Sequence, residues 1–202
     1  MKGTGIALSR PAPAGYVRAY RNPLYDTDDL QAAATAQVRF FQVPVGQLNA
    51  SAAVKTEADT NLTQAGQLAN PQMFDLFGFQ FETEPQVVVA DQVLVYQRGV
   101  FEFSFGTQRI WLQVPLSRIP QGPSQYITAA ATTVAATTIQ SAVWGSPSVR
   151  EYYPFVKPDG APYRIKATET FQCRTFWPSA AITASAVTTL RTFMIGILYI
   201  GL

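Results

Sequence analysis

The clearest pattern in the chain is an alternation of apolar and polar residues on both sides of a glycine turn. Residues 99–105 place Phe101, Phe103 and Phe105 on one face, and Glu102 and Ser104 on the other. After Gly106-Thr107 a second alternating run spans residues 108–116, with Ile110, Leu112 and Val114 opposite Arg109, Trp111 and Gln113. A period of two is typical of strands, and two such runs around a glycine turn predict a β-hairpin.

Other segments rich in β-branched and aromatic residues also predict strands. They are residues 37–45, 76–82, 86–96, 149–156, 163–177 and 191–201, which with the hairpin make eight strands. Phe77, Phe79 and Phe81 are expected to share one face. The run at 163–177 is expected to place Ile165, Ala167, Phe171 and Cys173 on its apolar face. Helices are too few to cover a parallel sheet, so the pattern predicts an all-β antiparallel sandwich or barrel.

The first 36 residues differ from the rest of the chain. Residues 1–21 carry four bases and no acid and are rich in proline and glycine, which is typical of an extended arm. Residues 27–35 predict a short helix, because Thr27 or Asp26 can act as N-cap and acids follow in the first turn. We therefore expect an N-terminal arm at residues 1–36 and a β-sandwich at residues 37–202.

Three long connections interrupt the predicted strands, at residues 46–75, 117–148 and 175–190. The second has no charged residue between Arg118 and Arg150, and the third has none between Arg174 and Arg191. Structureless loops of this length are uncommon in compact domains. The second and third connections each either contain an extra strand, fold over their own domain, or pack against a neighbouring copy of the chain.

Composition strengthens the third of these alternatives. The chain has 202 residues, which suits one domain or at most two small ones. Apolar residues make up 48% and charged residues only 14%, against about 25% charged in an average soluble domain. A surface so poor in charge is typical of a chain that packs against other chains.

The residue types also exclude several kinds of chemistry. The sequence has no histidine and one cysteine, Cys173. A disulfide within the chain, imidazole zinc sites and histidine-based catalysis are therefore excluded. Cys173 lies in the middle of a predicted strand, on its apolar face, and is interpreted as a small core residue.

Two groups of carboxylates remain as candidates. Glu82 and Glu84 match a glycosidase pair in principle, but a solvated strand end before a proline is the simpler interpretation. Asp26, Asp28 and Asp29 offer oxygen ligands for Ca²⁺, but Gln37 stands where an EF-hand needs a glutamate, so a helix-capping cluster is favoured. No phosphate-binding glycine motif occurs. We therefore predict no catalytic, cofactor-binding or metal-binding residues and no enzymatic activity.

Charge is unevenly distributed along the chain. Residues 1–21 carry a net +4, residues 22–97 a net −7 and residues 98–202 a net +5. The opposite signs of the last two segments favour side-by-side contact between identical copies. The bases of the arm, Lys2, Arg10, Arg18 and Arg21, allow weak contact with nucleic acid phosphates, or simply a solvated tail.

Two further observations concern membranes and ligands. The N-terminus lacks the apolar core of a signal peptide, and the apolar stretch at residues 192–202 is too short for a spanning helix, so no membrane span is expected. Several aromatic residues at strand ends and in loops are either core residues, interface anchors or platforms for sugars and bases. They are Trp111, Tyr126, Trp144, Tyr152, Tyr153 and Trp177.

The arrangement of runs resembles a known family. The hairpin at residues 99–116, followed by Ile119-Pro120-Gln121-Gly122, together with a short basic arm and an apolar last strand, is similar to the single jelly-roll capsid proteins of tailless icosahedral bacteriophages. The resemblance spans about residues 37–202, and eight runs match the strand count of a viral jelly roll. It implies an eight-stranded antiparallel jelly-roll sandwich with long loops and an extended N-terminal arm.

The resemblance also implies a function. In that family the protein self-assembles into homo-oligomeric capsomers, trimeric or larger, and encloses the genome within a virion. The chain is accordingly expected to be a structural virion protein, foremost the major capsid subunit of an icosahedral shell, in contact with itself and with other virion proteins. The alternatives are a spike, fibre or minor coat protein, or a carbohydrate-binding β-sandwich. The family has no catalytic residues to transfer to this sequence.

Overall fold

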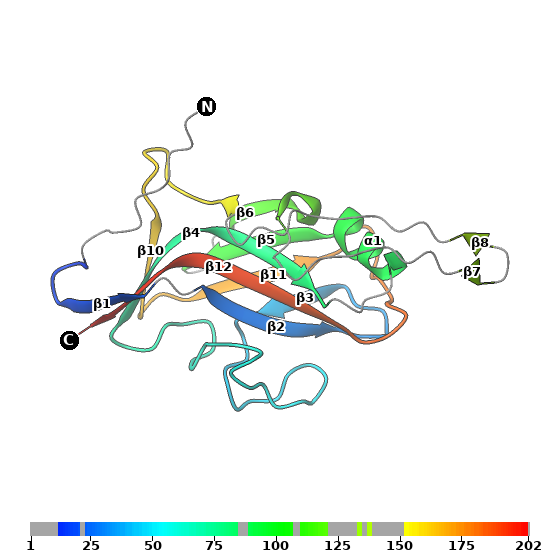
Figure 1. Ribbon diagram of the computed structural model, residues 1–202, viewed down its shortest axis with the longest axis horizontal. Helices are drawn as coiled ribbons and strands as arrows, with labels where there is room; N and C mark the ends of the chain where they lie inside the picture. Colours follow the sequence, from blue (N-terminus) through cyan, green and yellow to red (C-terminus); the bar gives the residue numbers. More distant parts are fainter. Residues whose placement is uncertain are drawn as a thin grey trace.

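Two antiparallel β-sheets packed face to face form the body of the protein (Figure 1). The computed structural model describes residues 12–20, 23–84, 89–106, 110–120, 133–134, 137–138 and 152–201. The first sheet contains β1 (Tyr16–Tyr20), β2 (Leu24–Leu30), β4 (Gln72–Thr83), β9 (Tyr153–Pro154), β10 (Tyr163–Lys166) and β12 (Thr188–Gly201). The second sheet contains β3 (Gln37–Phe40), β5 (Val100–Phe105), β6 (Ile110–Pro115) and β11 (Phe171–Phe176). The predicted all-β antiparallel sandwich is confirmed.

Three kinds of element lie outside the two sheets. Helix α1 (Val89–Arg98) connects β4 to β5, and the 3₁₀ helix η1 (Leu116–Arg118) follows β6. Strands β7 (Thr133–Val134) and β8 (Thr137–Thr138) pair only with each other among the described residues. Figure 1 shows α1 at one end of the sandwich, and β1 with the end of β12 at the opposite end.

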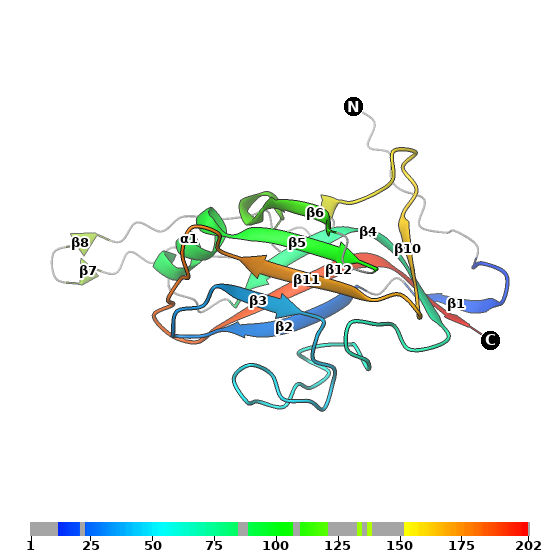
Figure 2. The ribbon, with the colours of Figure 1, turned by 180° about the vertical axis from the view of Figure 1, so that it is seen from behind.

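The strand pairs are nested in sequence. Strand β2 pairs with the last strand, β12, and β3 pairs with β11. Inside these pairs β4 pairs with β9 and β10, and β5 pairs with β6. Contacts of β12 with β4 and of β11 with β5 then join the pairs into the two sheets, which Figure 2 shows from the side of β11.

The space between the sheets is filled mainly by aromatic side chains. Phe79 of β4 is fully buried, and its ring centroid lies 5.1 Å from that of Phe101 and 5.0 Å from that of Phe103 in the facing sheet. The ring centroid of Phe155 lies 5.7 Å from that of Phe79, in the same aromatic cluster. Such tilted ring pairs stabilise a core beyond the area they bury. The predicted hairpin supplies Phe101 and Phe103 to this core, so the inward face of its first strand is confirmed at these two residues.

The run at residues 86–96 forms no strand where the structure describes it. Residues 89–98 form helix α1 instead, and Gln92, Val95 and Tyr96 lie on its buried face at the spacing of a helix. The helix ends at Gly99, whose N–H donates to the Val95 carbonyl and whose position has no room for a Cβ. β-branched residues suggested a strand, but packing of one helical face against the core overrides that weak preference.

The predicted helix at residues 27–35 is also wrong. Residues 24–30 form strand β2, which pairs with β12 from Leu24 opposite Met194 to Leu30 opposite Thr188. The sandwich therefore begins before residue 37. Part of the predicted arm is ordered as well, because β1 at residues 16–20 pairs with the end of β12. Residues 1–11 and 21–22 lie outside the described residues.

Two β-bulges shift faces that simple alternation assigned differently. In β4 the pairing with β12 passes from Gly78 to Leu76, so Phe77 is an extra residue. Phe77 consequently packs with Met73, Ile197 and Tyr199 rather than with Phe79. Because a bulge adds one residue to one strand, every side chain beyond it changes face relative to the period of two.

The bulge in β6 lies at Trp111, between the pairs of Leu112 with Phe103 and of Ile110 with Ser104. Trp111 therefore contacts Phe105 and Tyr163 through its ring and donates its indole N–H to the Phe105 carbonyl at 2.9 Å. Ile110, expected on the inward face, is 56% exposed. The predicted inward face of Ile110 is thus wrong at the bulge, whereas Trp111, expected on the outward face, is 39% exposed.

The run predicted as one strand at 163–177 is divided into β10 and β11, in different sheets. A turn at residues 167–168 separates them, and the Lys166 N–H donates to the Glu169 carboxylate at 2.7 Å. The inward face is nonetheless as predicted: Ile165, Phe171 and Cys173 are buried, and Ala167 packs against the core. Of the run at 149–156, residues 153–154 form β9.

Candidate functional site

Cys173 is enclosed in the core. Its side chain is fully buried in β11, as the sequence predicts. Burial raises the pKa of the Cys173 thiol well above its usual value, and the nearby Asp26 carboxylate raises it further. A thiol with a raised pKa and no access to solvent is a poor nucleophile. Cys173 therefore acts as a small core residue.

The Asp26, Asp28 and Asp29 cluster lies on β2 and caps no helix. Strand alternation turns Asp26 and Asp28 inward, where Lys55 from the β3–β4 connection meets them. The Lys55 Nζ atom lies 2.9 Å from Asp26 Oδ1 and 3.7 Å from Asp28 Oδ2. Asp29 faces the other way and accepts hydrogen bonds from Asn49 and Thr189. An ammonium group thus occupies the space between the two inward carboxylates.

The β3–β4 connection folds over its own domain. Besides Lys55, it places Leu62 and Leu68 in the core. Asn61 accepts a hydrogen bond from the Tyr25 N–H and donates to the Pro23 carbonyl, which fastens the connection to β2. In Figures 1 and 2 it forms the cyan coil alongside β2.

Glu82 and Glu84 do not form a solvated strand end. Glu82 is only 5% exposed at the end of β4. The Glu84 carboxylate accepts a hydrogen bond from the Thr189 N–H at 3.2 Å, so it binds the neighbouring chain segment. Among the described residues no group of three or more Cys, Asp or Glu side chains is placed to hold a metal ion.

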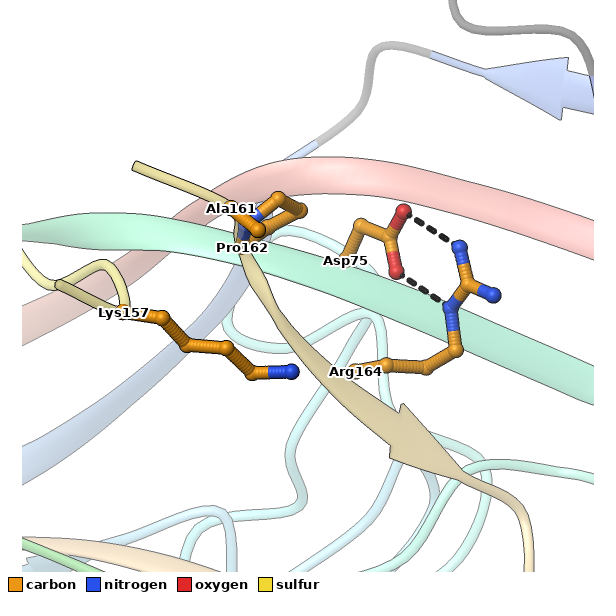
Figure 3. A pocket seen from close by; sticks show the side chains of 5 residues that line it. All are labelled: Asp75, Lys157, Ala161, Pro162 and Arg164. Carbon is orange, nitrogen blue, oxygen red and sulfur yellow. Dashed lines mark hydrogen bonds and ion pairs between the residues drawn. The ribbon is translucent and has the colours of Figure 1, made fainter. Parts of the chain in front are cut away.

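A hollow of about 240 Å³ opens on the outer side of the first sheet (Figure 3). Asp75 of β4 is completely buried, and both of its carboxylate oxygens accept hydrogen bonds from Arg164 of β10, at 2.7 and 2.9 Å. The Tyr199 hydroxyl donates to the same carboxylate at 3.2 Å. Lys157, Ala161 and Pro162 complete the lining. The Asp75 carboxylate already accepts hydrogen bonds from Arg164 and Tyr199. Among the described lining residues, Lys157 and Arg164 are cations, and none is placed to act as a base.

A second hollow of about 350 Å³ lies on the other side of Arg164. Tyr16, Met73, Lys166 and Pro71 contribute to its lining, and Tyr16 is the one aromatic residue among the described lining residues. Stacking of a sugar or a base uses broad aromatic platforms. In the part of the chain that the structure describes, neither hollow has such a platform.

Two of the most exposed large apolar side chains among the described residues form a pair on a small hairpin of the β3–β4 connection. Leu48 is 60% exposed and Val54 is 56% exposed, and the two residues form a β-bridge. The Asn49 side chain accepts hydrogen bonds from the N–H groups of Ser51 and Ala53 and donates to Asp29, so the hairpin is held in one conformation. Exposed apolar side chains on a preorganised hairpin are suited to contact with another protein.

The remaining predicted residues divide into described and undescribed ones. Trp177 is buried in the core, Tyr153 packs against the core, and Tyr152 packs against the outer cluster around Phe77. Arg18 lies in β1, whose pairing places this part of the arm beside β12. Lys2, Arg10, Arg21, Tyr126 and Trp144 lie outside the described residues, as does most of the connection at 117–148.

Sequence reasoning missed Lys55, Asp75 and Arg164. A signal existed for Asp75, because a single carboxylate within an apolar strand must find a partner when it is buried. Lys55 had no local signal, since its partner Asp26 lies 29 residues earlier in the chain.

Within the residues that the structure describes, no helix has the length and apolar character needed to cross a membrane.

No protein-family model, curated protein or solved structure matches this chain.

Proposed function

We propose that the protein is a structural subunit that self-assembles, and that it forms the capsid shell of a bacteriophage. The finer part of the proposal is that its sandwich is a jelly roll. The jelly-roll architecture is supported by the nested pairing of the strands. Strand β2 pairs with β12, β3 with β11, β4 with β9 and β10, and β5 with β6. Counting β9 and β10 as one partner, this makes eight strands.

The nesting supports a jelly roll for a topological reason. Four consecutive antiparallel pairs, each inside the previous one, amount to one long ribbon folded across itself. Folding that ribbon places β12 beside β4 and β11 beside β5, which are the other pairings among these eight strands. Viral capsid domains commonly use this architecture, but so do lectins and cupins. The fold alone therefore leaves the function open.

The exposed apolar residues and the residue types of this chain favour a structural subunit over a lectin or a cupin. Only 14% of the residues are charged, and the described part exposes the Leu48–Val54 pair, Ile110 and Trp111. A cupin-type metal site lacks histidine here, and a lectin-type site lacks an aromatic platform in either hollow. Apolar groups that remain exposed in one copy gain stability when a second copy covers them.

The direct test is the mass of the purified protein in solution, followed by negative-stain electron microscopy. We expect oligomers or particles, because contact between copies buries the exposed apolar side chains. Closed shells would support the capsid subunit, whereas elongated or small symmetric assemblies would support the spike or fibre alternative. A protein that stays monomeric at the highest attainable concentration would contradict self-assembly.

A variant tests whether the Leu48–Val54 hairpin lies at the contact between copies. Leu48→Asp places a charge on that exposed pair, and we expect the concentration needed for assembly to rise about tenfold or more, which corresponds to about 1.4 kcal/mol. The matched control is Ser51→Asp, which adds the same charge at the polar tip of the same hairpin. Thermal unfolding of dissociated Leu48→Asp should match the wild type. Assembly of Leu48→Asp at the wild-type concentration would remove this hairpin from the interface.

A further inference from the structure

Between β2 and the β3–β4 connection, one buried ammonium group lies beside two buried carboxylates, whereas a simple ion pair needs only one. Asp26, Lys55 and Asp28 are 0%, 2% and 7% exposed. The charged groups are therefore withdrawn from water together, and Lys55 is held beside two carboxyl groups at once. Enclosing an amine, a carboxyl group and a second carboxylate in one dry site brings together the groups needed for an acyl transfer.

Lys55 and Asp26 are placed as nucleophile and electrophile. The Lys55 Nζ atom lies 2.9 Å from Asp26 Oδ1 and 3.1 Å from Asp26 Oδ2, so it faces the carboxyl group as a whole. The backbone N–H of Phe41 donates to Asp26 Oδ2 at 2.5 Å. Such a donor stabilises the negative charge that develops on a carboxyl oxygen when a nucleophile adds to its carbon.

Asp28 is placed as the base. Its Oδ2 atom lies 3.7 Å from Lys55 Nζ, and the Asp29 N–H donates to its Oδ1 atom at 2.8 Å, which holds the side chain in position. Burial raises the pKa of the Asp28 carboxyl and raises that of Asp26 to about 6, although the Lys55 charge opposes both shifts. A raised pKa makes a carboxylate a stronger base.

We propose that Lys55 and Asp26 condense to an amide bond, an internal cross-link between β2 and the β3–β4 connection. Asp28 takes one proton from the Lys55 ammonium group, and the nitrogen lone pair then forms the Nζ–Cγ bond. One Cγ–O bond of Asp26 breaks, and its electron pair leaves with the oxygen. That oxygen departs as water with the proton held by Asp28 and a second proton from the nitrogen.

The step balances without any further reactant. An ammonium group and a carboxylate give one amide and one water, Asp28 returns to its starting state, and nothing is oxidised or reduced. The driving force is the removal of two charges from a site where desolvation makes them costly. The cross-link joins residues that are 29 positions apart and restricts the unfolded chain as a disulfide does. With its single cysteine, this chain cannot form an internal disulfide. The inference does not depend on the proposed function.

Intact-protein mass spectrometry of the purified wild-type chain is the test. We expect a mass lower by one water than the mass of the sequence, and a branched proteolytic peptide that joins Lys55 to Asp26. The full sequence mass in the folded wild-type protein after prolonged incubation would overturn the proposal. A water loss confined to one linear peptide would overturn it too, because it would indicate a cyclised aspartate instead.

Three variants separate the chemistry from folding. Lys55→Arg keeps the positive charge but cannot form this amide, so it should have the full sequence mass. Asp28→Asn keeps the shape of the side chain but removes the base, and the folded variant should lose water at least tenfold more slowly than the wild type. Lys166→Arg changes an exposed lysine and should lose water like the wild type. Water loss from Asp28→Asn at the wild-type rate would overturn the assignment of Asp28.

Discussion

Replacing Phe79 with alanine should lower the free energy of unfolding by about 3–5 kcal/mol, the range for a phenylalanine removed from a packed core. Phe79 is fully buried, and its ring contacts Phe101 and Phe103 across the sandwich as well as Phe155. The lost ring leaves a space that aromatic neighbours held by strands on both sides cannot fill. Chemical denaturation of the dissociated subunit, with the unfolding free energy extrapolated to water, measures the effect.

The matched control is Phe193→Ala. Phe193 lies on β12, where it faces away from the core and is half-buried, with the ring of Tyr25 at 6.3 Å. The same truncation at this position should cost about 1 kcal/mol, since much less apolar surface returns to water. Equal losses for the two variants would show that the space between the sheets is not the main core.

With the wild-type chain before amide formation as the reference, replacing Lys55 with methionine should lower the free energy of unfolding by about 3–5 kcal/mol, for an electrostatic reason. Methionine fills much of the same volume, but it leaves the fully buried Asp26 carboxylate with no positive charge beside it. A buried charge without a partner is far less favourable than the same charge in water. Urea or guanidinium unfolding of the variant at neutral pH measures the loss.

Two further variants identify the cause. Adding Asp26→Asn to Lys55→Met removes the unpaired charge while keeping an acceptor for the Phe41 N–H, so the double variant should recover a large part of the stability. Lys166→Met removes an exposed lysine of β10 and should change stability by less than about 0.5 kcal/mol. A double variant no more stable than Lys55→Met alone would mean that packing, rather than charge, makes Lys55 important.

The candidate sites were harder to predict than the strands because their partners are distant in sequence. Asp26 meets Lys55 across 29 residues, and Asp75 meets Arg164 across 89. The three aspartates near residue 28 are typical of a helix start when they are considered alone. Once Lys55 neutralises the two that face inward, the same residues form an edge strand of the first sheet.

The sequence of α1 contains signals for a strand as well as signals for a helix. Val89, Val93 and Val95 favour a strand, whereas Asp91 in the first turn, Arg98 in the last turn and Gly99 after it are typical helix ends. The helix is stabilised by contacts that local preference does not reveal. The Asp91 carboxylate accepts hydrogen bonds from Ser185, and the Tyr96 ring packs edge-on against Phe81.

By itself the sequence determined that this protein is an all-β sandwich, that the runs around Gly106 form the β5–β6 hairpin, and that Phe101, Phe103, Ile165, Phe171 and Cys173 point inward. These features follow from a period of two, which is a local property of an extended chain with one face in the core. Only the tertiary structure decided that β2 is a strand and α1 a helix, where the bulges at Phe77 and Trp111 shift the faces, and which buried charges meet. The reason is that these outcomes depend on free energies of contact between distant segments, which exceed the local preferences of the residues involved.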